Sequence, residues 1–296
     1  MVQELMTTQE VAEYLRIKER KVYDLVQRGA IPCSRVTGKW LFRKNLIDQW
    51  LDEHSHGAED LEGRGARPPV IGGSHDPLLE WAVRESGCEI ATLFNGSTDG
   101  LERFAKGALA VTGLHLLDAE SGEFNVAAAV AALPGVPFVL VEWAWREQGL
   151  MLPPGNPLHI GGLRDLVDRD VKVIDRQPGA GSHRLFRTLL GAEGIKVRSL
   201  QLLPAPARNE HEVAMAVLNG GADAGFGVAS AARQFGLGFV PLGRERYDLL
   251  VTRRDYFEPT VQHLLSYTRD PRFLAKGKEL GGYDLSGLGR VHYNAP

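Results

Sequence analysis

Three short stretches of this sequence place a hydroxyl side chain directly after a glycine and directly before a helix-like segment. They are Gly73-Ser74-His75, Gly96-Ser97-Thr98 and Gly181-Ser182-His183. The first N–H groups of a helix have no partner within it, and the helix dipole favours negative charge at that end. Glycine also lets a ligand approach the backbone closely. Three convergent junctions of this kind predict a site that binds a small anion through neutral donors.

The third junction offers the most donors. Residues 171–174 before it have strand character, and apolar residues recur after it at helical spacing. Between these segments, Arg176 and His183 add donors or positive charge beside Gly181 and Ser182. An ordinary strand-to-helix turn, capped by Ser182, is the competing interpretation of this stretch.

Enzyme chemistry has little support in the sequence. Ser182 and His183 are adjacent on one turn, where side chains seldom share a hydrogen bond, and no third group orients them. The glycine-rich turns lack the Lys-Ser/Thr of a phosphate-binding loop, and the strict metal-binding patterns are absent. Cys33 and Cys88 lie in different modules and fit a reducing compartment. We therefore expect no catalysis, no metal and no cofactor.

The elements that must position these junctions alternate between strand and helix from residue 70 onward. Such alternation predicts a doubly wound parallel sheet, which holds ligands beyond the carboxyl ends of its strands. Strands are expected at residues 70–72, 89–94, 108–116, 171–174, 239–242 and 247–252. A strand-rich run at residues 136–152 can cross into a second lobe. The glycine-rich tail after Gly281 predicts no element.

The first part of the chain has a different pattern. Thr7 or Thr8 can cap a helix, with Glu10 placed for a capping box. A second helix, a hairpin turning near Gly38 and a last helix are expected at residues 19–28, 31–42 and 44–51. Residues 16–44 carry a net charge of +7, whereas residues 57–296 carry −4. A small basic module attached to an acidic body indicates a nucleic-acid partner.

This module resembles the winged helix-turn-helix domains of the excisionase and MerR-like family. The resemblance lies in Thr8-Gln9-Glu10-Val11-Ala12-Glu13-Tyr14-Leu15 and in residues 22–26, 29–32 and 40–42. It implies that residues 19–28 form the recognition helix and that the hairpin is the wing. The residues implied to contact DNA are Lys18, Arg20, Lys21, Tyr23, Gln27, Arg35, Lys39 and Arg43. A solvated charged face is the alternative.

The rest of the chain resembles the periplasmic-binding-protein-like fold, in particular its intracellular branch related to molybdate-binding proteins. The matching stretches are residues 96–101, 112–118, 176–182, 222–225 and 247–249. The resemblance implies two α/β lobes with a ligand in the cleft between them. Together with the junctions, it gives the candidate ligand-binding residues Ser74, His75, Ser97, Thr98, His115, Arg176, Gly181, Ser182, His183, Asp223 and Tyr247.

Three of these candidates have alternative roles. His115 is equally consistent with a structural histidine. Asp223 would repel an oxyanion, so it would instead fix backbone N–H groups or receive a ligand hydroxyl or ammonium. Tyr247 could close the cleft or pack at the hinge between the lobes.

We predict an α/β protein with a winged helix-turn-helix at residues 1–55, a linker at 56–69 and a type II periplasmic-binding-protein-like domain at 70–296. Lobe 1 is expected at about 70–140 and 240–296, and lobe 2 at about 150–238. The sequence has no secretion signal and no membrane-length apolar run, so we expect a cytoplasmic protein.

The predicted function is a transcription regulator that binds double-stranded DNA, has no membrane partner and senses a small oxyanion, with molybdate or tungstate favoured. A homodimer is expected, because one winged module offers little specific affinity. The alternatives are a regulator that senses a small organic acid or amino acid, and an anion-binding protein that does not bind DNA.

Overall fold

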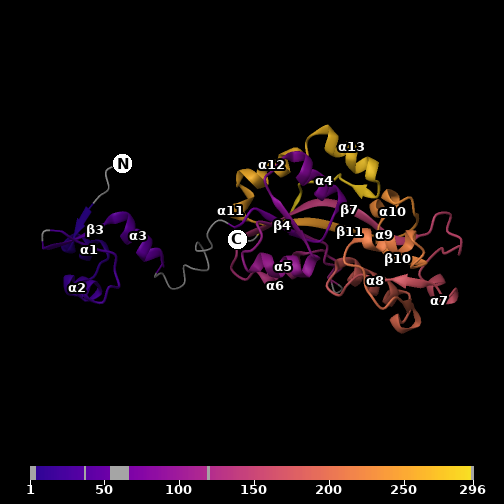
Figure 1. Ribbon diagram of the computed structural model, residues 1–296, viewed down its shortest axis with the longest axis horizontal. Helices are drawn as coiled ribbons and strands as arrows, with labels where there is room; N and C mark the ends of the chain where they lie inside the picture. Colours follow the sequence, from indigo (N-terminus) through magenta and orange to yellow (C-terminus); the bar gives the residue numbers. More distant parts are fainter. Residues whose placement is uncertain (1–4, 37, 54–66, 119–120, 295–296) are drawn as a thin grey trace. The chain divides into compact units, whose positions relative to one another are not determined.

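A computed structural model describes residues 5–36, 38–53, 67–118 and 121–294 (Figure 1). The chain divides into two compact units, residues 1–65 and 66–296, and each is considered by itself. Most of the predicted linker lies outside the described residues. Its end, however, belongs to the second unit, because the buried Arg67 donates to the carbonyls of Phe104 and Leu109 at 2.7 and 2.9 Å.

The first unit contains three helices and a small antiparallel sheet. The helices are α1 (Thr8–Tyr14), α2 (Glu19–Gln27) and α3 (Lys44–Glu53). The strands, in sheet order, are β1 (Leu5–Thr7), β3 (Lys39–Arg43) and β2 (Ser34–Val36). The predicted helices, the hairpin around residue 38 and the capping box between Thr7 and Glu10 are all present, but β1 was not predicted. Val11, Val22, Phe42 and Ile47 are fully buried and form the centre of its core.

The second unit is built on one continuous sheet. Its main strands run in the order β5 (Ala91–Phe94), β4 (Val70–Gly73), β6 (Val111–Leu114), β11 (Gly238–Thr252), β7 (Phe138–Leu152), β10 (Ala224–Val228), β8 (Lys172–Ile174) and β9 (Gln201–Leu202). The flanking strands β4–β6 and β8–β10 pair in parallel within their own groups, as predicted. The central pair, β7 and β11, is antiparallel and each strand is 15 residues long.

Strand β11 differs from the two separate segments that the sequence predicted. It is one strand with register shifts between Pro241 and Gly243 and between Tyr247 and Asp248. These irregularities interrupt the alternation of buried and exposed side chains, so the sequence pattern looked broken. Because β7 and β11 run through both groups of parallel strands, they connect lobe 1 and lobe 2.

Helices cover both faces of the sheet (Figure 1). In lobe 1, α4 (Pro77–Ser86), α12 (Pro259–Tyr267) and α13 (Pro271–Leu280) lie on one face, and α5 (Ser97–Ala105) and α6 (Val126–Ala132) lie on the other. In lobe 2, α9 (Glu210–Leu218) and α10 (Ala229–Gln234) lie opposite α7 (Asp165–Asp168) and α8 (Gly181–Ala192). A short helix at Arg253–Tyr256, α11, and a 3-10 turn at Val197–Ser199 complete the helical elements of the described residues.

The tail after Gly281, for which the sequence was uninformative, contains two strands. It forms β12 (Tyr283–Asp284) and β13 (Val291–Asn294), and both pair with β7. Backbone pairing, rather than a hydrophobic pattern, places these two short strands. Among the described residues, none of the helices combines the length and the apolar character that crossing a bilayer requires.

Candidate ligand-binding cleft and nucleic-acid interface

The three predicted junctions lie at the carboxyl ends of β4, β5 and β8, and the structure brings them together around His115. The Oγ atom of Ser74 lies 2.6 Å from His115 Nε2, and the Oγ atom of Ser97 accepts the His115 backbone N–H at 3.3 Å. From the other lobe, Gly181 packs against the imidazole so closely that a Cβ atom there would lie 2.7 Å from Nε2. His115 is therefore the point where the two lobes meet.

Two helix N-termini face this point without a side-chain cap. The N-cap residues are Gly96 for α5 and Ala180 for α8, and neither side chain satisfies a backbone N–H. The two N-termini touch across the cleft, because Thr98 Oγ1 donates to the carbonyl of Gly179 at 3.0 Å. Two opposed positive helix ends, one on each lobe, favour negative charge between them.

A buried carboxylate holds His115 from behind. Glu245 Oε2 lies 2.7 Å from His115 Nδ1, and its other oxygen accepts hydrogen bonds from Arg146 and, at 2.6 Å, from Gln148. Burial raises the pKa of the Glu245 carboxyl, but the charge of Arg146 and the hydrogen bonds from His115 and Gln148 lower it to about 2. Glu245 is thus ionised at neutral pH. Tyr247 stacks on the other side of the imidazole, with ring centroids 6.0 Å apart.

Arg146 links this carboxylate to a second one. Its guanidinium contacts Asp76 at 3.0 Å as well as Glu245, and all three side chains are buried. Burial lowers the pKa of Arg146, but the two carboxylates outweigh burial and raise it, so the guanidinium stays charged. Asp76 also caps α4 and accepts hydrogen bonds from Trp143 and Tyr283. The sequence analysis missed the roles of Arg146 and Glu245. Both are charged residues on the long strands β7 and β11, and a charged residue within a largely buried strand is the signal that could have identified them.

Ser182 does not mirror Ser97. Its hydroxyl donates to Glu210 Oε1 at 3.3 Å and lies 3.4 Å from Arg176, so its proton is used inside lobe 2. Arg176 and Glu210 form a buried ion pair. The expectation that the Ser182 hydroxyl and the Arg176 guanidinium face a ligand is therefore corrected: both belong to a polar network behind the N-terminus of α8.

Two other predicted residues have their polar side chains engaged by groups of lobe 2. Asp223 precedes β10 and accepts the backbone N–H of Lys172 at 2.9 Å, at the end of the parallel strands opposite to the cleft. It fixes a backbone group, as the sequence allowed, and is not placed to receive a ligand. His183 contacts the carbonyl of Arg176 at 3.1 Å and Asp175 at 3.2 Å, which orients its ring toward the start of α8.

Tyr247 is fully buried and does not close the cleft from outside. Its hydroxyl donates to the carbonyl of Ser74 at 2.5 Å. Burial raises the pKa of this phenol well above its usual value, so it remains a neutral donor. Its role is to fix the turn that carries Ser74.

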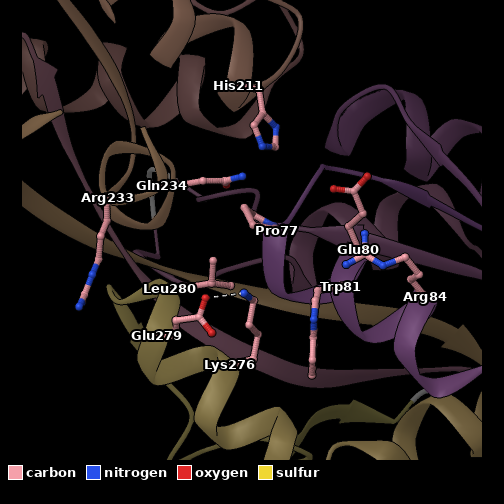
Figure 2. Close-up of a pocket in the computed structure, with 10 residues that line it drawn as sticks. All are labelled: Pro77, Glu80, Trp81, Arg84, His211, Arg233, Gln234, Lys276, Glu279 and Leu280. Atoms are coloured by element: carbon pink, nitrogen blue, oxygen red, sulfur yellow. Dashed lines mark hydrogen bonds and ion pairs between the residues drawn. The ribbon is translucent and has the colours of Figure 1, made fainter. Parts of the chain in front are cut away.

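His75 contacts Glu80 and His211, two residues that line a cavity of about 420 Å³. Its Nε2 lies 3.0 Å from Glu80, and its ring centroid is 5.1 Å from that of His211 on lobe 2. Figure 2 shows His211 and Gln234 reaching into this cavity opposite Glu80. The residues that line it come from both lobes and are Pro77, Glu80, Trp81, Arg84, His211, Arg233, Gln234, Lys276, Glu279 and Leu280.

His211 has a lowered pKa. Burial lowers the pKa of His211, and the nearby His75 lowers it further.

A smaller cavity of about 210 Å³ lies beside the segment that follows His115. It is lined by Leu116, Leu117, Asp118, Asn125, Ala127 and Ala128 of lobe 1 and by Arg184 of lobe 2.

The first unit presents a basic surface. Lys18, Arg20, Lys21, Tyr23, Gln27, Arg35, Lys39 and Arg43, the predicted DNA contacts, are all exposed. No carboxylate in the described part of the chain forms a salt bridge with the lysines and arginines of this set. The opposite side of α2 buries Val22 and Val26, which fixes the orientation of the exposed face.

Comparisons with known proteins agree with both architectures. The family model of the PBP superfamily domain matches residues 79–269, and a helix-turn-helix domain model matches residues 5–55. The chain is 28% identical to the uncharacterized protein YvgK of Bacillus subtilis (strain 168) over 302 residues, which cover 96% of each chain.

Two solved structures share the fold of the second unit. One is described as a phosphate ABC transporter substrate-binding protein with bound phosphate from Clostridium perfringens; it has a TM-score of 0.55 and 11% identity and covers 72% of this chain and 97% of that one. The other is the tungstate ABC transporter from Geobacter sulfurreducens, with a TM-score of 0.52 and 14% identity; the match covers 71% of this chain and 97% of that one. At these identities the likeness concerns the fold alone.

Proposed function

The chain belongs to the PBP superfamily and carries a helix-turn-helix domain before its binding domain, and from this premise we propose an oxyanion-responsive transcription regulator, with molybdate or tungstate favoured. The observation that carries the proposal is the pair of uncapped helix N-termini, α5 and α8, which face each other across the cleft at His115. An anion held there would be bound by both lobes at once.

The buried carboxylates near these N-termini are bonded to cationic side chains. Glu245 and Asp76 share the single Arg146 guanidinium, which leaves this group of three with a net charge of −1, and Glu210 pairs with Arg176. Paired carboxylates repel an approaching anion far less than free ones. Neutral backbone donors suit a small oxyanion, because its own charge strengthens each hydrogen bond that it accepts.

The hydroxyl of Ser97 is the best candidate for a direct side-chain donor. Its oxygen already accepts the His115 N–H, which leaves its own proton for a ligand. The hydroxyl of Thr98 is used by Gly179 and that of Ser182 by Glu210. A ligand that replaces the Thr98–Gly179 contact would keep the lobes together through its own bonds.

Ligand binding would act on DNA binding through population shift. A ligand that contacts both α5 and α8 binds the closed arrangement of the lobes better than the open one. Strands β7 and β11 connect the two lobes, so closure of the lobes changes the conformation of the second unit. The helix-turn-helix unit is attached to this second unit through the chain. In a homodimer, such a change would alter the spacing of two DNA-binding units.

One observation favours a second candidate ligand, a small amino acid or organic acid. The cavity of about 420 Å³ is lined by Glu80 and Arg84 of α4 and by Lys276 of α13, so it presents both a carboxylate and cationic groups. Such a mixture suits a zwitterion better than a simple oxyanion.

Calorimetric titration of the full chain tests the proposal. We expect heat with at least one of molybdate, tungstate, sulfate and phosphate, and a roughly ten- to hundredfold weaker affinity in Ser97→Ala, since a hydrogen bond to a charged group contributes about 1.5–3 kcal/mol. Ser86→Ala is the matched control, because this buried hydroxyl bonds only to the Val83 carbonyl and the Cys88 N–H at the end of α4, within lobe 1. No heat with any oxyanion, together with heat from an amino acid, would favour the second candidate.

A further inference from the structure

Ser74 lies on a sharp turn between a strand and a helix, which is where serine nucleophiles of many hydrolases lie. The preceding Gly73 has φ +91°, and a Cβ atom there would lie 2.8 Å from Gly113 N, so the turn requires glycine. The Ser74 N–H donates to the Gly113 carbonyl at 2.9 Å, and the Ser74 carbonyl accepts the Tyr247 hydroxyl. The backbone of Ser74 is therefore fixed on both sides.

The side chain of Ser74 begins a chain of two short hydrogen bonds. Its Oγ lies 2.6 Å from His115 Nε2, and His115 Nδ1 lies 2.7 Å from Glu245 Oε2. The three residues are 3%, 2% and 0% exposed. An ionised Glu245 accepts the proton of Nδ1, which leaves Nε2 as the acceptor for the Ser74 hydroxyl. A hydroxyl, a base within reach and a group that orients the base are the components of an activated serine.

We propose that Ser74, His115 and Glu245 form a nucleophilic relay that acts on small carboxylic esters. The inference rests on the proposed anion site for one component: the N–H groups at the starts of α5 and α8 would stabilise the tetrahedral oxyanion of an ester under attack. A tetrahedral intermediate has the shape and charge that such donors suit. The nucleophile itself depends only on Ser74, His115 and Glu245.

The reaction balances without any reactant other than the ester and water. Ser74 Oγ bonds to the ester carbonyl carbon, and its proton passes to His115 Nε2. The alcohol then leaves with that proton as its C–O bond breaks, and an acyl-Ser74 remains. Water attacks the acyl carbon and gives its proton to His115, and the carboxylic acid leaves as Ser74 recovers a proton. Glu245 stays ionised throughout and stabilises the imidazolium.

Access to Ser74 sets the size of the substrate. The serine is buried where the lobes meet, so an ester enters only when the lobes separate.

The test is covalent labelling of the full chain with a fluorophosphonate, which bonds to an activated serine as fluoride leaves, followed by mass spectrometry of its peptides. We expect the label on Ser74 in the wild type and in Ser86→Ala, whose buried hydroxyl bonds to the carbonyl of Val83 and touches no imidazole. Ser74→Ala should take up none, and His115→Gln should label at least a hundredfold more slowly. Absence of label from folded wild type, or labelling that His115→Gln leaves unchanged, would overturn the proposal.

Two further measurements separate this relay from a structural hydrogen-bond chain and from the proposed anion sensing. Glu245 is a positioning residue, so Glu245→Gln should alter the pH profile of labelling rather than only its extent. If His115→Gln does not fold, the wild-type labelling rate decides: it should rise with pH as the base of the relay loses its proton, and a flat profile would count against the relay. Labelling without oxyanion heat would retain the relay and remove anion sensing, and heat without labelling would do the reverse.

Discussion

Replacing Gly181 with alanine should separate the two lobes without damaging either one. Gly181 is the first residue of α8, and its added Cβ would lie 2.7 Å from Nε2 of His115, which belongs to the other lobe. The imidazole cannot simply turn aside, because both of its nitrogens are hydrogen-bonded, to Ser74 and to Glu245. Either the relay breaks or α8 moves away from lobe 1.

The size of the effect follows from the contact. Two heavy atoms in unstrained contact are about 3.5–4.0 Å apart. Because Cε1 of the imidazole would lie closer to the added Cβ than Nε2 does, the helix or the ring has to shift by more than about 1 Å. Overpacking of this kind costs about 1–3 kcal/mol. Gly191 provides the control, because it lies in the same helix and a Cβ there meets nothing within 4 Å. Gly191→Ala should instead stabilise the protein by about 0.5–1 kcal/mol through helix propensity.

Thermal unfolding and small-angle scattering measure the two consequences. For a domain of this size, about 1 kcal/mol corresponds to about 2–4 °C in melting temperature. We expect Gly181→Ala to melt several degrees lower and Gly191→Ala slightly higher than the wild type, with a larger radius of gyration only for Gly181→Ala. Equal stabilisation by both substitutions would refute the close approach of the lobes at His115.

Three further outcomes follow from particular contacts. Arg20→Ala and Lys21→Ala should each weaken binding to duplex DNA and reduce the slope of log affinity against log salt by about one unit, as measured by fluorescence anisotropy; unchanged slopes would move the DNA contact elsewhere. Burial and His75 lower the pKa of His211 in the folded state below the unfolded value of about 6.5. The unfolded chain therefore binds more protons, and the stability of the fold should fall as pH drops through about 6.5. His211→Asn should reduce that loss of stability in thermal melts between about pH 5 and 7.5. Arg176→Met should lower the free energy of unfolding by about 3–5 kcal/mol in urea titrations, because it leaves Glu210 buried without its partner. Adding Glu210→Gln to this variant should restore part of the lost free energy of unfolding.

Local sequence patterns predicted the elements that depend on neighbours in the chain. The capping residue Thr7, the two-helix module and the three strand-to-helix junctions all arise from residues a few positions apart. The same reasoning brought Ser74, Ser97 and Gly181 to one cleft, because the carboxyl ends of parallel strands share an edge. The resemblance to known families supplied the two-lobed arrangement, which the family models confirm.

The partners of these residues could not be predicted in this way. Glu245 is 130 positions from His115, and Arg146 is 70 positions from Asp76, so no local pattern connects them. Ser97 and Ser182 occupy equivalent places in their motifs, but only the structure shows that Glu210 takes the Ser182 proton. The strands β12 and β13 were missed for a similar reason, since pairing with β7 and not their own composition makes them strands.

The most direct test of the central claim measures oxyanion affinity with and without DNA. A duplex selected by the full chain from a random pool supplies the DNA, and calorimetry with molybdate, tungstate, sulfate and phosphate supplies the affinities. Because coupling between two sites is reciprocal, an oxyanion that changes DNA affinity must itself bind with an affinity changed by the same factor, on the order of 5- to 150-fold. We predict such a change in the wild type and a much weaker oxyanion affinity in Ser97→Ala. The same oxyanion affinity with and without DNA, or no oxyanion binding at all, would contradict the account.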